Sequence, residues 1–347
     1  MSSTPSWDSE RGRALLPCLL LALASCALAP REERLAGTAN CSRILRQLSD
    51  PDPAIHELLQ RYNFPPDPFP WRLEPSAETE HYRVFRLTFP SPRKYDLPEA
   101  NTVHCEYYLP RQLKGRGPAI VVLDILDGSF RVARLVCRSF ALAGTPSLLV
   151  KMPYYGERRP AGTSLYQTFV GRPERMLGAV EGTVVEVRRA ASWLASRREV
   201  DPARIGLVGT SLGGIISALA AGVDPSFSRN VLILAGSDPA GILWHAPETQ
   251  GVRERLERLG LDLGGLREQA RAIDPLTFAR RAKAGSFLMI NATADDTVPR
   301  KNTLALWEAL GRPAIHWYPA GHYTIALFIP AILPSAIQFV HSQPRSR

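Results

Sequence analysis

The sequence predicts an α/β fold, a doubly wound and mostly parallel sheet with helices on both faces. After residue 118, short apolar runs without polar alternation are followed by longer helical segments, the pattern of strands covered on both faces. Two earlier runs rich in Val, Tyr, Phe and Thr predict antiparallel leading strands. The chain has 347 residues, 45% of them hydrophobic and 22% charged, which provides for a large core and excludes disorder throughout.

The expected elements alternate along the chain. The leading strands are expected at Tyr82–Phe89 and Thr102–Leu109. Parallel strands are expected at Ala119–Leu126, Ser147–Met152, Ile205–Gly209, Val231–Ala235, Phe287–Asn291 and Ile315–Tyr318. Helices are expected at Phe130–Leu142, Glu174–Arg198, Leu212–Ala221, Thr303–Leu310 and Tyr323–His341. Right-handed crossovers between such strands produce a doubly wound sheet.

One interval between strands, at about residues 237–284, is far longer than an ordinary crossover. It contains helical stretches at Val252–Leu259 and Leu266–Ala272. We interpret it as a helical cap over the carboxyl edge of the sheet, inserted into a domain of residues 76–343.

Residues 26–75 are expected to form a proline-rich spacer that precedes this domain. Asp50-Pro51-Asp52-Pro53 and the proline run of residues 65–70 limit helix and strand alike. A short helix is expected between them, at Ala54–Arg61.

Residues 1–25 have the pattern of a signal peptide. The apolar run Ala14–Ala24 is too short to span a bilayer but has the length of a signal-peptide core, and Arg11 and Arg13 precede it. The run ends in Leu23-Ala24-Ser25-Cys26, which resembles the bacterial lipobox. This resemblance implies acylation of Cys26 and a lipid anchor in a cell-envelope membrane. The alternatives are a secreted or periplasmic protein and an uncleaved anchor.

The formal net charge of +9 is spread along the chain in clusters of mixed sign, such as Arg253-Glu254-Arg255. Such clusters are typical of solvated helix faces, and no basic run has interleaved aromatic residues, so nucleic acid is not an expected partner. No nicotinamide fingerprint, phosphate-binding loop or metal-ligand spacing is present in the sequence, so no cofactor is implied.

The strongest motif is Gly209-Thr210-Ser211-Leu212-Gly213, which lies between a predicted strand and a predicted helix. In this setting G-x-S-x-G forms a sharp turn that projects the serine from the edge of the sheet. The glycines are needed because a Cβ there would collide with the neighbouring strand or helix. Ser211 is therefore the candidate nucleophile, and the helix that starts behind it favours negative charge.

A serine hydroxyl needs an adjacent base, oriented by a third group. Asp295 begins D-x-x-V-P after one late strand, and His322 follows Gly321 after the last strand. With Ser211 these residues occur in the order Ser, Asp, His, and over about residues 119–340 the chain resembles the α/β-hydrolase superfamily, including its esterases, dienelactone hydrolases and prolyl oligopeptidases. The resemblance implies that Ser211 is the nucleophile, Asp295 the orienting acid and His322 the general base.

Other residues compete for two of these roles. Asp296 adjoins Asp295, and Asp238 follows the preceding strand, where some members of the superfamily carry the acid. His245 is the other histidine expected in a loop near the same edge of the sheet.

An oxyanion hole requires two donors aimed at the developing charge. One is expected from the amide of Leu212, directly after the nucleophile. The other is expected from the loop after Ala119–Leu126, where related sequences often have His-Gly and this one has Asp127-Gly128-Ser129. The second donor is therefore Gly128 or Ser129.

The segment Met152-Pro153-Tyr154-Tyr155-Gly156-Glu157-Arg158-Arg159-Pro160 resembles a signature of a poorly characterised branch of bacterial α/β-hydrolases. Arg158 or Arg159 could bind a substrate anion through a bidentate guanidinium contact, with Tyr154 and Tyr155 beside it. In the alternative interpretation the arginines pair with acids of the protein and the tyrosines pack beneath the cap.

Taken together, these residues predict a serine hydrolase that cleaves a carboxylic ester of a small molecule through an acyl-enzyme. A serine peptidase or amidase of prolyl-oligopeptidase type is the first alternative. The second is a catalytically silent, membrane-tethered binding protein. Peptide and ester substrates, or labelling by an active-site probe, distinguish the three.

Overall fold

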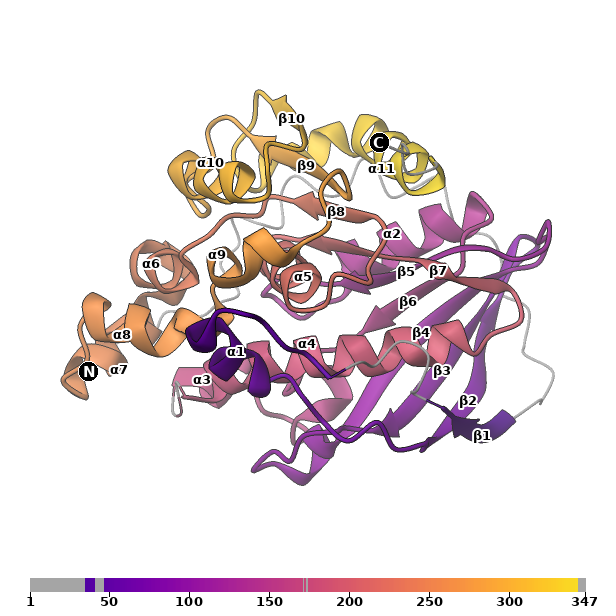
Figure 1. Ribbon diagram of the computed structural model, residues 1–347, viewed down its shortest axis with the longest axis horizontal. Helices are drawn as coiled ribbons and strands as arrows, with labels where there is room; N and C mark the ends of the chain where they lie inside the picture. The colour runs from indigo at the N-terminus through magenta and orange to yellow at the C-terminus, as the bar shows by residue number, and fades with distance from the viewer. Residues whose placement is uncertain (1–34, 41–46, 171, 173, 343–347) are drawn as a thin grey trace.

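The computed structural model describes residues 35–40, 47–170, 172 and 174–342. They form one mixed sheet of 10 strands (Figure 1), which confirms the predicted fold class. In their order across the sheet the strands are β1 Leu35–Ala39, β2 Phe69–Glu78, β3 Tyr82–Pro90, β4 Thr102–Pro110, β6 Ser147–Val150, β5 Gly117–Leu123, β7 Val200–Thr210, β8 Asn230–Ile233, β9 Phe287–Ala292 and β10 Ala314–Tyr318.

The strands from β6 to β10 pair in parallel, as expected. The leading strand β4 pairs antiparallel with β6 and so connects the two parts of the sheet. Every side chain of β6, β8 and β9 is buried. The absence of polar alternation in these runs therefore has the expected physical cause, since helices cover both faces of this half of the sheet.

The sheet begins earlier than the sequence pattern predicts, because β1 and most of β2 lie within the segment expected as a spacer. Pro70 and Pro75 argued against a strand there, but Pro75 lies at a register shift between β2 and β3, where a proline is tolerated. Phe69, Trp71 and Leu73 alternate along β2, and the Trp71 ring packs edge-on against the Trp193 ring at 5.9 Å. Burial of this apolar face outweighs the proline signal.

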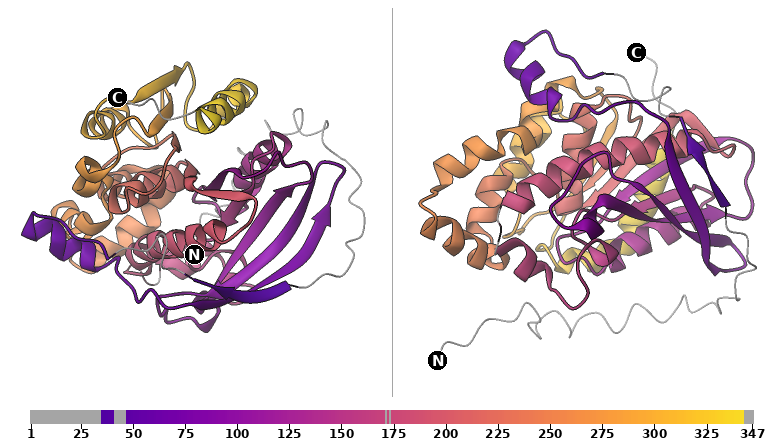
Figure 2. Two further views of the ribbon diagram at one scale, coloured as in Figure 1. Left: turned by 45° about the vertical axis from the view of Figure 1, so that its right-hand side comes forward. Right: turned by 90° about the horizontal axis from the view of Figure 1, so that it is seen from below.

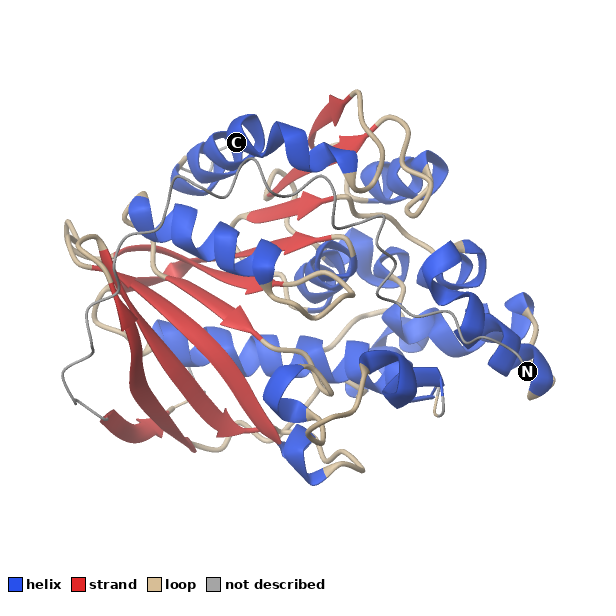
Figure 3. Cartoon of the chain, turned by 180° about the vertical axis from the view of Figure 1, so that it is seen from behind, coloured by secondary structure: helices blue, strands red, loops and turns tan. Residues whose placement is uncertain are grey.

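Helices lie on both faces of the parallel part of the sheet (Figures 1 and 3). α2 Arg131–Leu142 and α11 Ile329–His341 contact each other on one face, whereas α4 Glu174–Ala195, α5 Leu212–Val223 and α10 Arg300–Ala309 lie on the other. The segment Thr324–His341, which comprises the 3-10 helix η8 Thr324–Phe328 and α11, is long and apolar enough to cross a membrane by length and composition. Its contacts with α2, β8 and β9 are those of a helix that covers a sheet.

The long interval between β8 and β9 contains α6 Pro239–His245, α7 Gln250–Arg258, α8 Leu263–Ala270 and α9 Pro275–Phe278. α6 packs against α7 and α8, and α9 returns to pack against α5. Two further helices, α1 Pro53–Gln60 and α3 Leu165–Val170, lie beside this group (Figure 2). The Tyr62 hydroxyl, just after α1, donates to the Ala272 carbonyl, and Arg281 forms an ion pair with Asp50.

Candidate active site

Ser211 lies at the sharp turn between β7 and α5. Its φ of +53° and ψ of −118° are strained for a residue with a side chain. A Cβ at Gly209 would lie 2.1 Å from the Gly213 carbonyl oxygen, and a Cβ at Gly213 would lie 2.4 Å from the Leu123 carbonyl oxygen. Neither position can hold a side chain without moving backbone, so both glycines of the motif are required by packing.

Two loops at the carboxyl ends of β9 and β10 bring the other predicted residues to this turn. The strands are parallel neighbours, and their pairing continues past their ends because the Ala294 amide donates to the Ala320 carbonyl at 2.9 Å. Asp295 is fixed further by amides of its own loop, since its Oδ1 accepts from Thr297 at 3.0 Å and from Val298 at 2.7 Å. The D-x-x-V-P pattern is therefore a local turn that orients the carboxylate.

Ser211, His322 and Asp295 form a continuous hydrogen-bonded chain. Ser211 Oγ lies 2.9 Å from His322 Nε2, and His322 Nδ1 lies 2.9 Å from both carboxylate oxygens of Asp295. Since a carboxylate only accepts, the Nδ1–H donates to Asp295 and Nε2 is left to accept from the serine hydroxyl. Ser211 is 9% exposed and His322 is 8% exposed, so these hydrogen-bonded side chains are largely shielded from solvent but can still be reached from it.

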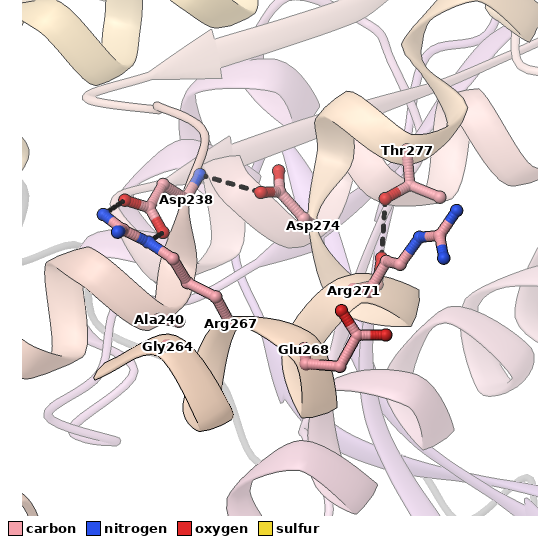
Figure 4. Close-up of a pocket in the computed structure, with 8 residues that line it drawn as sticks. All are labelled: Asp238, Ala240, Gly264, Arg267, Glu268, Arg271, Asp274 and Thr277. Atoms are coloured by element: carbon pink, nitrogen blue, oxygen red, sulfur yellow. Dashed lines mark hydrogen bonds and ion pairs between the residues drawn. The ribbon is translucent and has the colours of Figure 1, made fainter. Parts of the chain in front are cut away.

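The competing residues do not take part in this chain. Asp238 caps α6 and forms an ion pair with Arg267 at 2.7 Å, in a polar pocket of about 310 Å³ within the insertion (Figure 4). Burial opposes ionisation of Asp238, but the bonds from Arg267 and from the Gly241 amide outweigh it and hold its pKa below the usual value. Asp296 is exposed beside Asp295, and His245 is exposed at the end of α6.

The two predicted second donors differ in their surroundings. The Ser129 amide already donates to Asp127 Oδ1 at 2.8 Å, so it is not free to meet a substrate oxygen. Gly128 has a φ of +66°, which favours glycine, and lies in the loop that leaves β5. Of the two predicted donors, Gly128 is the one that the geometry supports, together with Leu212 at the first position of α5.

The tyrosine and arginine motif after β6 is largely internal. Arg158 is fully buried and forms a bidentate ion pair with Glu186, and the Tyr154 hydroxyl donates to Asp96 Oδ1 at 2.9 Å. The Tyr155 hydroxyl donates to the Leu126 carbonyl at 3.1 Å. Each of these three side chains is buried and already has a partner within the protein, which favours the alternative interpretation that they pair and pack internally. Arg159 is half-buried, and its predicted role in substrate binding stays a prediction.

A family model described as alpha/beta hydrolase domain containing 18 matches residues 39–242, more than half of the chain. The chain belongs to this family. A second model, the prolyl oligopeptidase family, matches residues 180–320. Uncharacterized proteins from two strains of Mycobacterium tuberculosis are each 30% identical over 193 residues, which cover 54% of this chain and 45% of each relative. The match thus spans about half the length of these relatives.

Solved structures show the same fold as this chain. Acetyl xylan esterase 1 from Thermoanaerobacterium sp. JW/SL YS485 is 17% identical with a TM-score of 0.64, and the match covers 87% of this chain and 98% of that one. An acetyl xylan esterase from Paenibacillus sp. R4 is 15% identical with the same score, over 86% and 98% of the two chains. Acylaminoacyl peptidase from Pyrococcus horikoshii is 15% identical with a TM-score of 0.57, over 82% and 50%.

One buried acid beside the site was not singled out from the sequence. This acid is Asp124, which directly follows β5 and is 3% exposed. Its carboxylate accepts from the amides of Phe130 at 2.8 Å and Ala133 at 3.3 Å, which ties the loop to the start of α2. Burial, reinforced by nearby Asp127, raises the pKa of Asp124 to about 6. The sequence signal that could have identified Asp124 is an acidic residue at the end of an otherwise apolar strand.

Proposed function

We propose that this protein is a serine hydrolase that cleaves a carboxylic ester of a small molecule. The supporting observation is the hydrogen-bonded chain from Ser211 through His322 to Asp295. Ser211 Oγ attacks the ester carbonyl while His322 Nε2 takes the hydroxyl proton, and Asp295 stabilises the resulting imidazolium. The Leu212 and Gly128 amides bind the oxyanion. His322 then protonates the leaving alcohol, and water hydrolyses the acyl-enzyme by the same route.

Ester rather than amide cleavage is supported by how much of each related structure the chain matches. The two acetyl xylan esterases match over 98% of their length, whereas the acylaminoacyl peptidase matches over 50% of its length. The match to the prolyl oligopeptidase family model keeps a peptidase or amidase as the second candidate. A silent binding protein is disfavoured, because the strain at Ser211 and its bond to His322 serve no evident purpose in a protein without catalysis.

The deciding experiment is labelling of the purified protein with a fluorophosphonate probe, followed by peptide mapping. A single adduct on Ser211 is expected, absent in Ser211→Ala and retained in Ser217→Ala, a matched change of a buried serine on the same helix. Labelling of Ser211→Ala, or failure to label the folded wild-type protein, contradicts the proposal. A screen of short-chain p-nitrophenyl esters against acyl-amino-acid anilides then separates esterase from peptidase.

We also propose that the protein is exported and anchored to a cell-envelope membrane through Cys26, a residue outside the described part of the chain. The support is the signal-peptide pattern of residues 1–25 alone. Incorporation of a labelled fatty acid into the wild-type protein and not into Cys26→Ala tests it. Equal incorporation, or none, contradicts the anchor.

A further inference from the structure

We propose that Tyr155 is a positioning residue that holds the loop Leu126–Gly128 against the Ser211 turn, so that the second oxyanion donor stays in place. The inference rests on the proposed hydrolase function and extends it to a motif that the proposed triad does not use. Tyr155 acts through the loop and does not touch the substrate.

The start of this loop packs against the turn that carries the nucleophile. Leu123, the last residue of β5, is paired with Gly209 of the nucleophile motif. The positions of the Leu123 and Asp124 carbonyls leave no room for a side chain at Gly213, where a Cβ would lie 2.4 Å from one oxygen and 2.6 Å from the other. The end of β5 and the first residue of the loop are therefore in tight contact with the turn that carries Ser211.

Tyr155 holds this loop at two points. Its hydroxyl donates to the Leu126 carbonyl at 3.1 Å, which restrains the peptide plane between Leu126 and Asp127. Its ring lies against Gly128, since a Cβ there would be 2.7 Å from Tyr155 Cδ1 and 2.8 Å from Leu165 Cδ1. The polar and the apolar contact come from one side chain, so a single residue restrains both the Leu126 peptide and the backbone position of Gly128.

Leu165 shares the apolar contact at Gly128, and the other side-chain hydrogen bonds of this loop act elsewhere. Asp124 accepts from Phe130 and Ala133, and Asp127 accepts from the amide and the hydroxyl of Ser129. These bonds fix the part of the loop that enters α2. Within the described part of the chain, the Leu126 carbonyl accepts its hydrogen bond from the Tyr155 hydroxyl.

Tyr155 can serve as a fixed point because its own segment is anchored. Its side chain is 1% exposed, its amide donates to the Met152 carbonyl at 3.1 Å, and its carbonyl accepts from the Arg158 amide at 3.0 Å. Arg158 is in turn held by Glu186 on α4. Burial raises the pKa of the Tyr155 phenol well above its usual value, so the hydroxyl remains a donor wherever the protein is folded.

The test compares Tyr155→Phe with Tyr154→Phe in the full-length protein. The Tyr154 hydroxyl bonds to Asp96, away from the loop, so the second variant removes the same atom from the same motif without touching Leu126. With a short-chain p-nitrophenyl ester, Tyr155→Phe is expected to lower kcat by about 10- to 100-fold, less than the loss of a whole oxyanion donor, with KM changed less than about twofold. Tyr154→Phe is expected to leave both within about twofold of the wild type.

The affinity for a trifluoromethyl ketone, which forms a tetrahedral oxyanion on an active serine, separates a positioning role from a merely structural one. A merely structural role would leave this affinity unchanged. The affinity of the ketone for Tyr155→Phe is expected to fall by the same factor as kcat. The proposal is overturned if Tyr155→Phe keeps the wild-type kcat. It is also overturned if Tyr155→Phe and Tyr154→Phe lose kcat equally and in proportion to their loss of thermal stability.

A second variant covers the case in which Tyr155→Phe does not fold. Gly128→Ala pushes the loop away from the same ring and is expected to lower kcat with little change in KM, and an unchanged kcat overturns the proposal. Failure of the fluorophosphonate to label wild-type protein removes the hydrolase function and the positioning role together. A labelled wild type with a fully active Tyr155→Phe removes the positioning role alone.

Discussion

Glu186 on α4 and Arg158 in the loop after β6 form a bidentate ion pair, with N···O distances of 2.6 and 2.7 Å and both side chains at 0% exposure. Glu186 Oε1 also accepts from Ser91 at 2.7 Å and from Tyr95 at 3.0 Å. Because the pair joins the loop of Tyr155 to the longest helix, it couples the motif after β6 to the core.

Glu186→Gln is expected to destabilise the protein by about 3–5 kcal/mol, because it leaves the buried Arg158 guanidinium without a counter-charge. Urea unfolding followed by circular dichroism measures the change. The matched control is Glu308→Gln in the exposed pair with Arg312, expected to cost less than about 0.5 kcal/mol. Equal costs for the two variants contradict the assignment of Arg158 to the core.

Asp295→Asn is expected to lower ester kcat/KM by about 10³- to 10⁴-fold, because the amide no longer holds His322 in the tautomer that accepts from Ser211. Steady-state kinetics with a p-nitrophenyl ester measures the loss. Asp296→Asn serves as the neighbouring control and Asp238→Asn as the control for the acid after β8. Either control falling as far as Asp295→Asn contradicts the assignment.

Gly209→Ala is expected to destabilise the protein by at least about 2 kcal/mol, since its Cβ would overlap the Gly213 carbonyl oxygen. Gly178→Ala on α4 has open space around the added Cβ and is expected to be neutral or stabilising by about 0.5–1 kcal/mol. The midpoints of urea unfolding compare the two. A Gly209→Ala protein as stable as Gly178→Ala contradicts the tight packing of the turn.

Asp124 predicts a specific pH dependence of stability. Its folded pKa of about 6 lies above the ordinary value of 3.8, so the folded protein binds more protons than the unfolded chain between these two values. The contribution of Asp124 to folding is therefore greatest below about pH 3.8 and falls by about 3 kcal/mol as the pH rises through 6.

Asp124→Asn removes this titration and keeps the shape of the side chain. The free energy of unfolding, measured by urea at intervals from pH 4 to 7, is expected to fall more steeply with pH in the wild type than in the variant. Parallel curves contradict the raised pKa.

The sequence alone predicts the fold and the order of its main elements because the signals are local. Apolar strands, helical periodicity and the glycines around Ser211 each act within a few residues. The same holds for the loops of Asp295 and His322, which follow strands whose carboxyl ends must share one edge of the sheet.

Other features could not be predicted because they depend on contacts between distant parts of the chain. The strand β2 forms despite its prolines because Trp71 packs against Trp193 on α4. Asp238 is occupied by Arg267, 29 residues further along the insertion. Arg158 has the same side chain whether it meets a substrate or Glu186, and only packing determines which.

Sequence by itself therefore determined the doubly wound sheet, the turn at Ser211 and the positions along the chain of Asp295 and His322. The tertiary structure alone decided which acid lies within 2.9 Å of His322, that residues 35–39 and 69–78 join the sheet, and that Tyr155 and Arg158 face the protein interior. The physical reason is that backbone conformation and burial period are encoded locally, whereas the partner of a polar side chain is set by which distant element is packed beside it.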